Sequence, residues 1–389
     1  MKVFVVTRIA LAVIALVAVA LLPDFSGVAE DTRAALPLVP TPVSVPGWPA
    51  RGVTPGWHNL FTVWERQDAL WYLRIADQGY ATDDASAAFF PLYPMVVRGV
   101  SFVLGGHPLA AGLLVSNAAF LGALAVLWAL TRSELSEELA RRAVLYAAVF
   151  PTAFFFVAPY SESLFLLLVV TAFWAARRSR WELAGLAGAL AALTRNIGVV
   201  LFLPLALEAV YQSLSARPRR WQVRGLAWSL APVTGTLAYL GFWGARSGDW
   251  LAPLHQQAAW QRSLAIPLAT LWNGTRDAYR YIGLYPGGYH LLDWLITVAV
   301  LAAAGYALVK FRPSYAAFAW ASIIVPLASQ FASRPLIAFS RYALPIFPVY
   351  WAFARWTSGR PVRHELLVGI SAALLGLMTL LFVNWYYII

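Results

Sequence analysis

One carboxylate in the first hundred residues stands at the start of an aromatic helix pattern. Asp68, Trp71, Tyr72 and Ile75 follow the i, i+3, i+4, i+7 spacing that puts side chains on one helix face, and Gly79 is a helix C-terminal stop. A carboxylate on an apolar face is costly to keep ionised unless it is paired, and this is a setting suited to a general base. The spacing predicts a helix that presents these four side chains on one face and ends near Gly79, with Asp68 as a candidate base.

A second carboxylate begins an apolar run. Glu162 follows Tyr160 and Ser161, and ionisable side chains at membrane depth are costly and usually functional. The alternative is a structural helix start, with Ser161 as the N-cap and Glu162 offsetting the helix dipole. Arg195 and Asn196 interrupt the next long apolar stretch. This arginine is a candidate phosphate ligand because a guanidinium matches a phosphate group; the alternative is an arginine that snorkels to the membrane surface.

Aromatic side chains stand beside two prolines in the segment before residue 95. Phe90 precedes Pro91, and Tyr93 precedes Pro94. The segment is either a helix start with proline in its first turn or an aromatic wall for a lipid or a sugar. A later polar loop offers His255 as a further candidate, with an incidental loop histidine as the alternative.

The composition is that of a membrane protein. The 389-residue chain is 60% hydrophobic and 12% charged, with a mean hydropathy of +0.65. Soluble domains carry about 25% charged residues, so a soluble enzyme, a disordered chain and a collagen-like chain are excluded. The lack of cysteine excludes disulfides, thiolate catalysis and cysteine metal sites. The net charge of +11 comes from arginines clustered between apolar runs, which is typical of membrane-anchored loops rather than of nucleic-acid binding.

The elements that must position these residues are membrane-spanning helices. We expect an all-α polytopic bundle of about 11 transmembrane helices, forming a single membrane domain over residues 1–389. The apolar runs lie at about 4–22, 107–130, 143–158, 161–176, 182–194, 197–214, 225–245, 291–309, 315–332, 342–356 and 365–387. Residues 89–106 are also apolar but contain Pro91 and Pro94, which predicts an interfacial or re-entrant helix rather than a span.

The basic residues orient this bundle. With the N-terminus in the cytoplasm, the net positive charge lies on the cytoplasmic side, as the positive-inside rule requires. Residues 23–106 and 246–290 are then long outer loops, and long loops usually carry function. The helix at Asp68 becomes an outer-face juxtamembrane helix with its aromatic rings at headgroup depth. Its alternative is an ordinary interfacial helix with Asp68 tied to Arg66 or Arg74.

Two further arginines fall on the outer side, against the charge bias. The outer position of Arg334 and Arg341 indicates that each has an anionic partner there, either a lipid phosphate or an outer carboxylate. No Gly-rich nucleotide loop follows a strand pattern, and no His/Glu metal spacing stands out. A nucleotide-sugar or ATP site is therefore unsupported.

Taken together and in this order, the motifs resemble the PIG-V family of mannosyltransferases, which belongs to the GT-C class of membrane glycosyltransferases. The resemblance runs over residues 64–208 and is weaker thereafter, through residues 341–348. Gln67 stands where the family has Trp, and the order of residues at 194–198 is altered. The segments that match are Asp68-Ala69, Ile75-Ala76, Gly79-Tyr80, 88–91 with Pro94, and Tyr160-Ser161-Glu162.

The resemblance implies a GT-C-like bundle that transfers mannose, with inversion, from a polyprenyl-phosphate carrier to a lipid, glycan or protein acceptor at the outer face. An acidic residue in the first outer loop is the general base of this class, and Asp68 occupies that position. Arg195, Arg341 or Arg334 would stabilise the departing phosphate. Because that phosphate activates the sugar, no nucleotide or redox cofactor is required, and a divalent metal is left open. The substrate-binding candidates are Glu65, Trp71, Tyr72, Phe90, Tyr93, Tyr160, Glu162, Asn196 and His255.

The arginine-rich, lysine-poor composition places this protein in a bacterial inner membrane. The competing interpretation is a transporter or flippase for a lipid-linked sugar. A transporter would carry inverted repeats and charged residues at mid-bilayer. In this sequence the ionisable residues gather instead at the outer ends of the spans and in the outer loops, which favours an enzyme.

Overall fold

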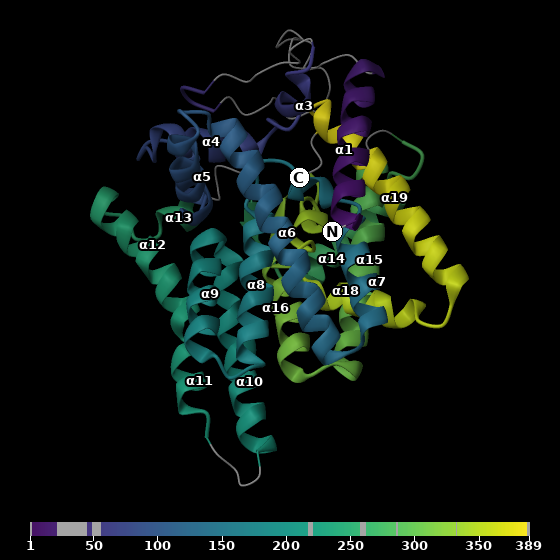
Figure 1. Cartoon of the computed structure of the whole chain (residues 1–389). Helices are drawn as coiled ribbons and strands as arrows, with labels where there is room; N and C mark the ends of the chain where they lie inside the picture. The colour runs from purple at the N-terminus through teal and green to yellow at the C-terminus, as the bar shows by residue number, and fades with distance from the viewer. Residues whose placement is uncertain are drawn as a thin grey trace.

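The computed structural model describes residues 2–21, 45–48, 56–216, 221–256, 262–284, 287–331 and 333–386. Within these ranges the chain folds as a helical bundle, and the sheet that they contain pairs two three-residue strands (Figure 1). The expectation of an all-α protein is confirmed. Much of the first outer loop expected over 23–106 lies outside the described residues before position 56.

Helices of two lengths build the apolar part of the bundle. Five stretches in the described ranges are long and apolar enough to cross a membrane: α1 (Lys2–Leu21), α6 (Pro108–Glu134), Asn196–Ser215, α15 (Gly287–Lys310) and α19 (Pro361–Val383). Four shorter apolar helices accompany them: α5 (Leu92–Val103), α8 (Glu162–Ala176), α9 (Trp181–Thr194) and α16 (Pro313–Leu327). The chain is an integral membrane protein, whereas the expected count of 11 spans is not confirmed.

The remaining elements are short or partly polar. The stretch Asn196–Ser215 consists of the 3-10 helix η4 (Asn196–Leu201) and α10 (Phe202–Ser215). The other helices are α3 (Asn59–Thr62), α4 (Asp68–Gln78), η2 (Ala85–Ala88), α7 (Glu137–Ala148), η3 (Ala153–Phe156), α11 (Val223–Trp228), α12 (Ala231–Ser247), α13 (Ala252–His255), α14 (Pro267–Arg280), α17 (Phe339–Tyr342) and α18 (Phe347–Thr357). The strands are β1 (Arg262–Leu264) and β2 (Ser329–Phe331).

The bundle has two distinct ends. Helices α6, α8 and α9 pack side by side through its middle, with α12 against α9 and α16 against α10. The first and last helices, α1 and α19, pack together at one side (Figure 1). Helices α4 and α5 cover one end, which we call the α4 end, and the last turn of α10 and the start of α11 lie at the opposite end (Figure 1).

Glycine allows two very close backbone approaches in the bundle. Because lipid is as apolar as the side chains, membrane helices associate through close packing at small residues. A Cβ added to Gly235 of α12 would lie 2.4 Å from the carbonyl oxygen of Ala189 in α9. A Cβ added to Gly198 of η4 would lie 2.4 Å from the carbonyl oxygen of Ala191. The second contact fixes the backbone immediately after Arg195.

Several expected helix bounds are wrong, and proline accounts for the largest error. The run expected over 143–158 is helical only to Ala148, where α7 ends. Pro151 and Pro159 follow, and only a short 3-10 helix forms between them. The run expected over 225–245 is divided into α11 and α12, and the run over 342–356 begins its main helix, α18, at Phe347.

The apolar segment 89–106 forms the short helix α5. Its 12 residues extend about 18 Å at 1.5 Å per residue, well short of a hydrocarbon core of about 30 Å. Pro91 is the N-cap residue and Pro94 lies in the first turn, as expected of a helix start. The helix lies beside α4 at the α4 end, and its length agrees with an interfacial or re-entrant helix, a placement that stays a prediction (Figure 1).

Candidate active site

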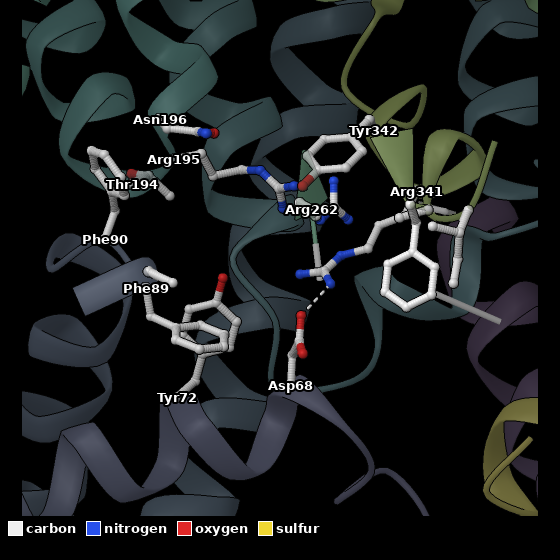
Figure 2. A pocket seen from close by; sticks show the side chains of 14 residues that line it. Asp68, Tyr72, Phe89, Phe90, Thr194, Arg195, Asn196, Arg262, Arg341 and Tyr342 are labelled. Carbon is white, nitrogen blue, oxygen red and sulfur yellow. Dashed lines mark hydrogen bonds and ion pairs between the residues drawn. The ribbon is translucent and has the colours of Figure 1, made fainter. Parts of the chain in front are cut away.

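A cavity at the α4 end brings together residues from distant parts of the chain. It encloses about 760 Å³, part of which is open to solvent. Its walls come from α4, the segment after η2, the end of α9, both strands and α17 (Figure 2). The lining residues are Asp68, Tyr72, Ala88, Phe89, Phe90, Thr194, Arg195, Asn196, Arg262, Phe331, Ile337, Ala338, Arg341 and Tyr342.

Asp68 is the first residue of α4, and its carboxylate faces the cavity (Figure 2). The residue before it, Gln67, has a φ of +54°, a strained conformation for a side chain other than glycine. The Gln67 amide donates a 2.8 Å hydrogen bond to the carbonyl oxygen of Tyr386, which holds this turn. The Asp68 side chain is 19% exposed, so a substrate hydroxyl can reach it.

The partner of Asp68 is Arg341, not one of the nearby arginines. Arg341 Nη1 donates to Asp68 Oδ2 across 273 residues of sequence. Arg74 instead forms an ion pair with Asp84, and Arg66 donates to the carbonyl oxygen of Val383 at 2.9 Å. The expectation that Asp68 is tied to Arg66 or Arg74 is wrong, because both of those guanidiniums are held elsewhere.

The aromatic face of α4 is covered by protein. The helix runs from Asp68 to Gln78, and its predicted end at Gly79 is confirmed, but Trp71, Tyr72 and Ile75 are buried. Helices α5 and α6 pack over α4, and Trp71 stacks on Phe89 with ring centroids 5.5 Å apart. The expected interfacial helix with its rings among lipid headgroups is therefore wrong. Burial fixes the helix, so Asp68 projects from a rigid support.

Tyr72 places a protonated hydroxyl at the cavity. Its hydroxyl and that of Ser161 are 2.9 Å apart. Burial raises the pKa of Tyr72 to about 12, so the phenol stays neutral at physiological pH. It can therefore donate a hydrogen bond to a molecule in the cavity.

Three arginines converge on the cavity from three elements. Arg195 is the C-cap of α9, Arg341 belongs to α17 and Arg262 belongs to β1. In Figure 2 all three guanidiniums lie in the same region as the Asp68 carboxylate. Two of them approach the Tyr342 ring, with Arg195 at 5.2 Å and Arg262 at 5.5 Å from its centroid. The lining therefore carries more positive than negative charge and suits an anion.

Glu162 lies behind this wall and is fully buried. Its Oε1 accepts hydrogen bonds from both Arg195 and Arg341, and Arg195 Nη1 also donates to Ser161 Oγ at 3.2 Å. Ser161 is the N-cap residue of α8, as the structural alternative predicts, but its side chain makes no capping hydrogen bond. Glu162 does stand in the first turn of α8, where the helix dipole favours a negative charge.

Several predicted site residues do not line the cavity. Arg334 forms a buried ion pair with Asp293, with Nη2 to Oδ1 at 2.8 Å, so the structure does not bring it to Arg195 and Arg341. His255 is exposed and bonds Asp249 at 2.9 Å, and this hydrogen bond lowers the pKa of the Asp249 carboxyl.

Four more candidates are buried in the supporting core. Tyr160 donates to the Arg66 carbonyl at 3.0 Å, and the Tyr93 and Ser116 hydroxyls are 2.8 Å apart. Glu65 and Trp71 are buried as well. Of the predicted set, the cavity is lined by Asp68, Tyr72, Phe90, Arg195, Asn196 and Arg341.

Arg262 is the main site residue that the sequence interpretation missed. It reaches the cavity because β1 pairs with β2, with Arg262 opposite Phe331. Strands of three residues leave no readable alternation in a sequence. The available signal was its position within 246–290, the segment expected to be the second outer loop, where an arginine would also work against the positive-inside bias.

No group of three His, Cys, Asp or Glu side chains is arranged to hold a metal ion in the described ranges. The polar groups that converge on the cavity are the Asp68 carboxylate, the guanidiniums and a few hydroxyl and amide groups. Their chemistry is that of proton transfer and anion binding.

Comparison with known proteins gives a family match and distant structural neighbours. Residues 1–226, more than half of the chain, match the family model Mannosyltransferase (PIG-V). The matched part contains Asp68, Glu162 and Arg195, whereas Arg262 and Arg341 follow it. No curated protein matches the chain.

Among solved structures, ArnT from Cupriavidus metallidurans bound to undecaprenyl phosphate is similar at 15% identity and a TM-score of 0.48, covering 82% of this chain and 71% of that one. The Archaeoglobus fulgidus oligosaccharyltransferase complex with zinc and sulfate is similar at 13% identity and a TM-score of 0.43, and the match covers 96% of this chain and 53% of that one. AglB from the same organism, in complex with an inhibitory peptide and a dolichol-phosphate, is similar at 12% identity and a TM-score of 0.40, covering 98% and 55%. The chain thus spans about half the length of the archaeal proteins. By the match over residues 1–226, the chain belongs to the PIG-V family of mannosyltransferases.

Proposed function

We propose that this protein transfers mannose from a polyprenyl-phosphate carrier to an acceptor hydroxyl, with inversion, using Asp68 as the general base. The observation that carries the proposal is the convergence of Asp68 with Arg195, Arg262 and Arg341 on one cavity. A carboxylate beside a cluster of guanidiniums supplies a proton acceptor and a phosphate site in one space. The family match supports mannose as the sugar.

The chemistry follows from these groups. Asp68 takes the proton of an acceptor hydroxyl, whose oxygen forms a bond to the anomeric carbon of mannose. The bond from that carbon to the phosphate oxygen breaks on the opposite side, which inverts the centre. The electron pair leaves with the polyprenyl phosphate, and the guanidiniums of Arg195, Arg262 and Arg341 stabilise the charge that develops there.

The donor site is proposed to bind a lipid phosphate because its three guanidiniums form a surface that matches phosphate oxygens. Lipid phosphates of this type are bound in the structures of ArnT (undecaprenyl phosphate) and AglB (dolichol-phosphate). For this chain the acceptor is a lipid, glycan or protein at the membrane surface.

We further propose that the N-terminus is cytoplasmic and that the α4 end faces the outside of a bacterial inner membrane. Arg177 follows α8 at the end opposite Glu162, and it pairs with Glu134 and Glu208 there. Arg312 lies within 3.6 Å of the same two carboxylates. The arginine cluster at residues 177–180 belongs to that end, which supports a cytoplasmic location for it.

The test compares wild type with Asp68→Asn in lipid nanodiscs, using radiolabelled polyprenyl-phosphate mannose and a membrane-lipid extract as acceptor source. Wild type is expected to move label to a new product, and Asp68→Asn to lower kcat by at least about 100-fold. Asp249→Asn is the matched control, since it neutralises an exposed carboxylate of the second outer loop.

Donor binding separates the outcomes of this test. Asp68→Asn is expected to bind the donor at least as well as wild type, because Arg341 loses a competing carboxylate. Full transfer activity in Asp68→Asn would remove Asp68 as the base. Donor binding without any transfer by wild type, over a range of acceptor extracts, would refute the mannosyltransferase proposal.

A further inference from the structure

Glu162 is placed in a way that an ordinary buried ion pair does not require. Its carboxylate is fully buried, and one oxygen, Oε1, accepts from both Arg195 and Arg341. The other oxygen, Oε2, is buried and accepts no hydrogen bond from any residue that the structure describes. Two like charges are thus held together by a single oxygen atom, although a buried carboxylate is stabilised best when both of its oxygens are bonded.

Glu208 shows the fully bonded arrangement elsewhere in this protein. It is also fully buried, but Oε1 accepts from Arg177 and Gln212 at 2.7 and 2.9 Å, while Oε2 accepts from Ser314 at 2.7 Å. This group lies at the end opposite the cavity. The comparison indicates that the Glu162 arrangement serves the cavity wall rather than the fold alone.

Arg341 uses different nitrogens for its two carboxylates. Nε donates to Glu162, and Nη1 donates to Asp68. A ligand in the cavity can therefore take Nη1 away from Asp68 while Nε stays anchored on Glu162. Arg195 is held on the same Glu162 oxygen, so both guanidiniums keep their places when the ligand arrives.

We propose that Glu162 is a positioning residue that holds Arg195 and Arg341 as a paired phosphate site, from which an incoming lipid phosphate withdraws Arg341 from Asp68. This inference rests on the proposed function and adds to it the order of two events, donor binding and the release of Asp68. Asp68 is engaged by Arg341 in the free enzyme and becomes available as a base only when the donor phosphate is bound. Without Glu162 the two guanidiniums repel each other, and Arg341 turns fully to Asp68.

The test measures binding of a short-chain polyprenyl phosphate, which lacks the sugar, to the full-length protein in nanodiscs. Glu162→Gln keeps the shape of the side chain and removes its charge, and Glu208→Gln is the matched control. Glu162→Gln is expected to weaken lipid-phosphate binding by about tenfold or more, since charge-assisted hydrogen bonds to both arginines are lost. It is expected to raise the donor KM by a similar factor while kcat at saturating donor changes less.

A second variant tests the competition directly. Adding Asp68→Asn to Glu162→Gln removes the competing carboxylate, so lipid-phosphate binding is expected to recover by a larger factor than Asp68→Asn produces in the wild-type background. Glu162→Asp, which keeps the charge on a shorter side chain, is expected to bind with intermediate affinity. It serves as the fallback if Glu162→Gln does not fold.

The inference is overturned if Glu162→Gln and Glu162→Asp both bind the lipid phosphate like wild type, or if Glu208→Gln weakens binding as much. It is also overturned if Asp68→Asn has the same effect in both backgrounds. The proposed function fails separately: a wild type that binds the lipid phosphate but transfers no mannose refutes it, while the binding series still decides the role of Glu162.

Discussion

Arg262 offers the cleanest test of the phosphate site. In the described ranges no carboxylate lies within ion-pair distance of it, and its guanidinium lies 5.5 Å from the Tyr342 ring centroid. Arg341, by contrast, neutralises Asp68 and Glu162. Removing Arg262 therefore breaks no ion pair among the described residues, whereas removing Arg341 leaves two carboxylates short of a partner.

The expected magnitudes differ accordingly. A charge-assisted hydrogen bond to phosphate contributes about 1.5–3 kcal/mol, so Arg262→Ala is expected to raise the donor KM about 10- to 150-fold. The loss of its contact with the Tyr342 ring reduces the free energy of unfolding by only about 0.5–1 kcal/mol. Arg341→Ala also weakens donor binding, but it breaks a buried pair and is expected to cost about 3–5 kcal/mol of stability.

The assay is donor saturation kinetics in nanodiscs, with thermal denaturation of each variant measured in parallel. Arg246→Ala is the matched control, since this exposed arginine in the last turn of α12 donates to the Tyr80 carbonyl at 2.7 Å and does not line the cavity. Arg262→Lys is expected to recover part of the affinity, because lysine restores the charge but not the planar fork. A donor KM for Arg262→Ala within twofold of wild type would refute the assignment of Arg262 to the phosphate site.

Two further predictions concern the backbone that supports the site. Gly198→Ala places a Cβ against the Ala191 carbonyl, so it is expected to lower the free energy of unfolding by about 1–3 kcal/mol. Because the backbone after Arg195 must then shift, the affinity for the donor is expected to fall as well. A variant with the stability and the donor KM of wild type would contradict the close approach. Gln67→Gly is expected to be more stable than Gln67→Ala by about 1 kcal/mol, because both lose the bond to the Tyr386 carbonyl but only glycine accommodates a φ of +54°. Denaturation of the two variants side by side measures this difference, and an alanine variant of equal or greater stability would argue against strain at this turn.

Local patterns in the sequence predicted local structure well. A helix that carries Asp68, Trp71, Tyr72 and Ile75 on one face and stops at Gly79 follows from residues within one or two turns of each other, and the structure has it as expected. The expected helix over 143–158 was wrong because Pro151 and Pro159 each lack a backbone donor, and an apolar run alone does not show where a helix ends.

The sequence could not predict the contacts between distant segments. Arg334 and Arg341 stand seven positions apart in similar surroundings, yet one meets Asp293 and the other meets Asp68 and Glu162. No local feature distinguishes them, since each partner is set by how the helices pack. Arg262 was missed for the same reason, because its approach to the cavity depends on the pairing of β1 with β2.

The separation of the site residues along the chain also bears on biogenesis. Asp68 and Arg341 touch across 273 residues, and Glu162 and Arg341 across 179. A nascent chain that has inserted only its first helices already carries Asp68, but its carboxylate has neither the arginine that restrains it nor a complete phosphate site. Synthesis must pass residue 341 before Asp68, Glu162 and Arg341 can meet, so under the proposed function the base and the phosphate site form only after most of the chain has been made.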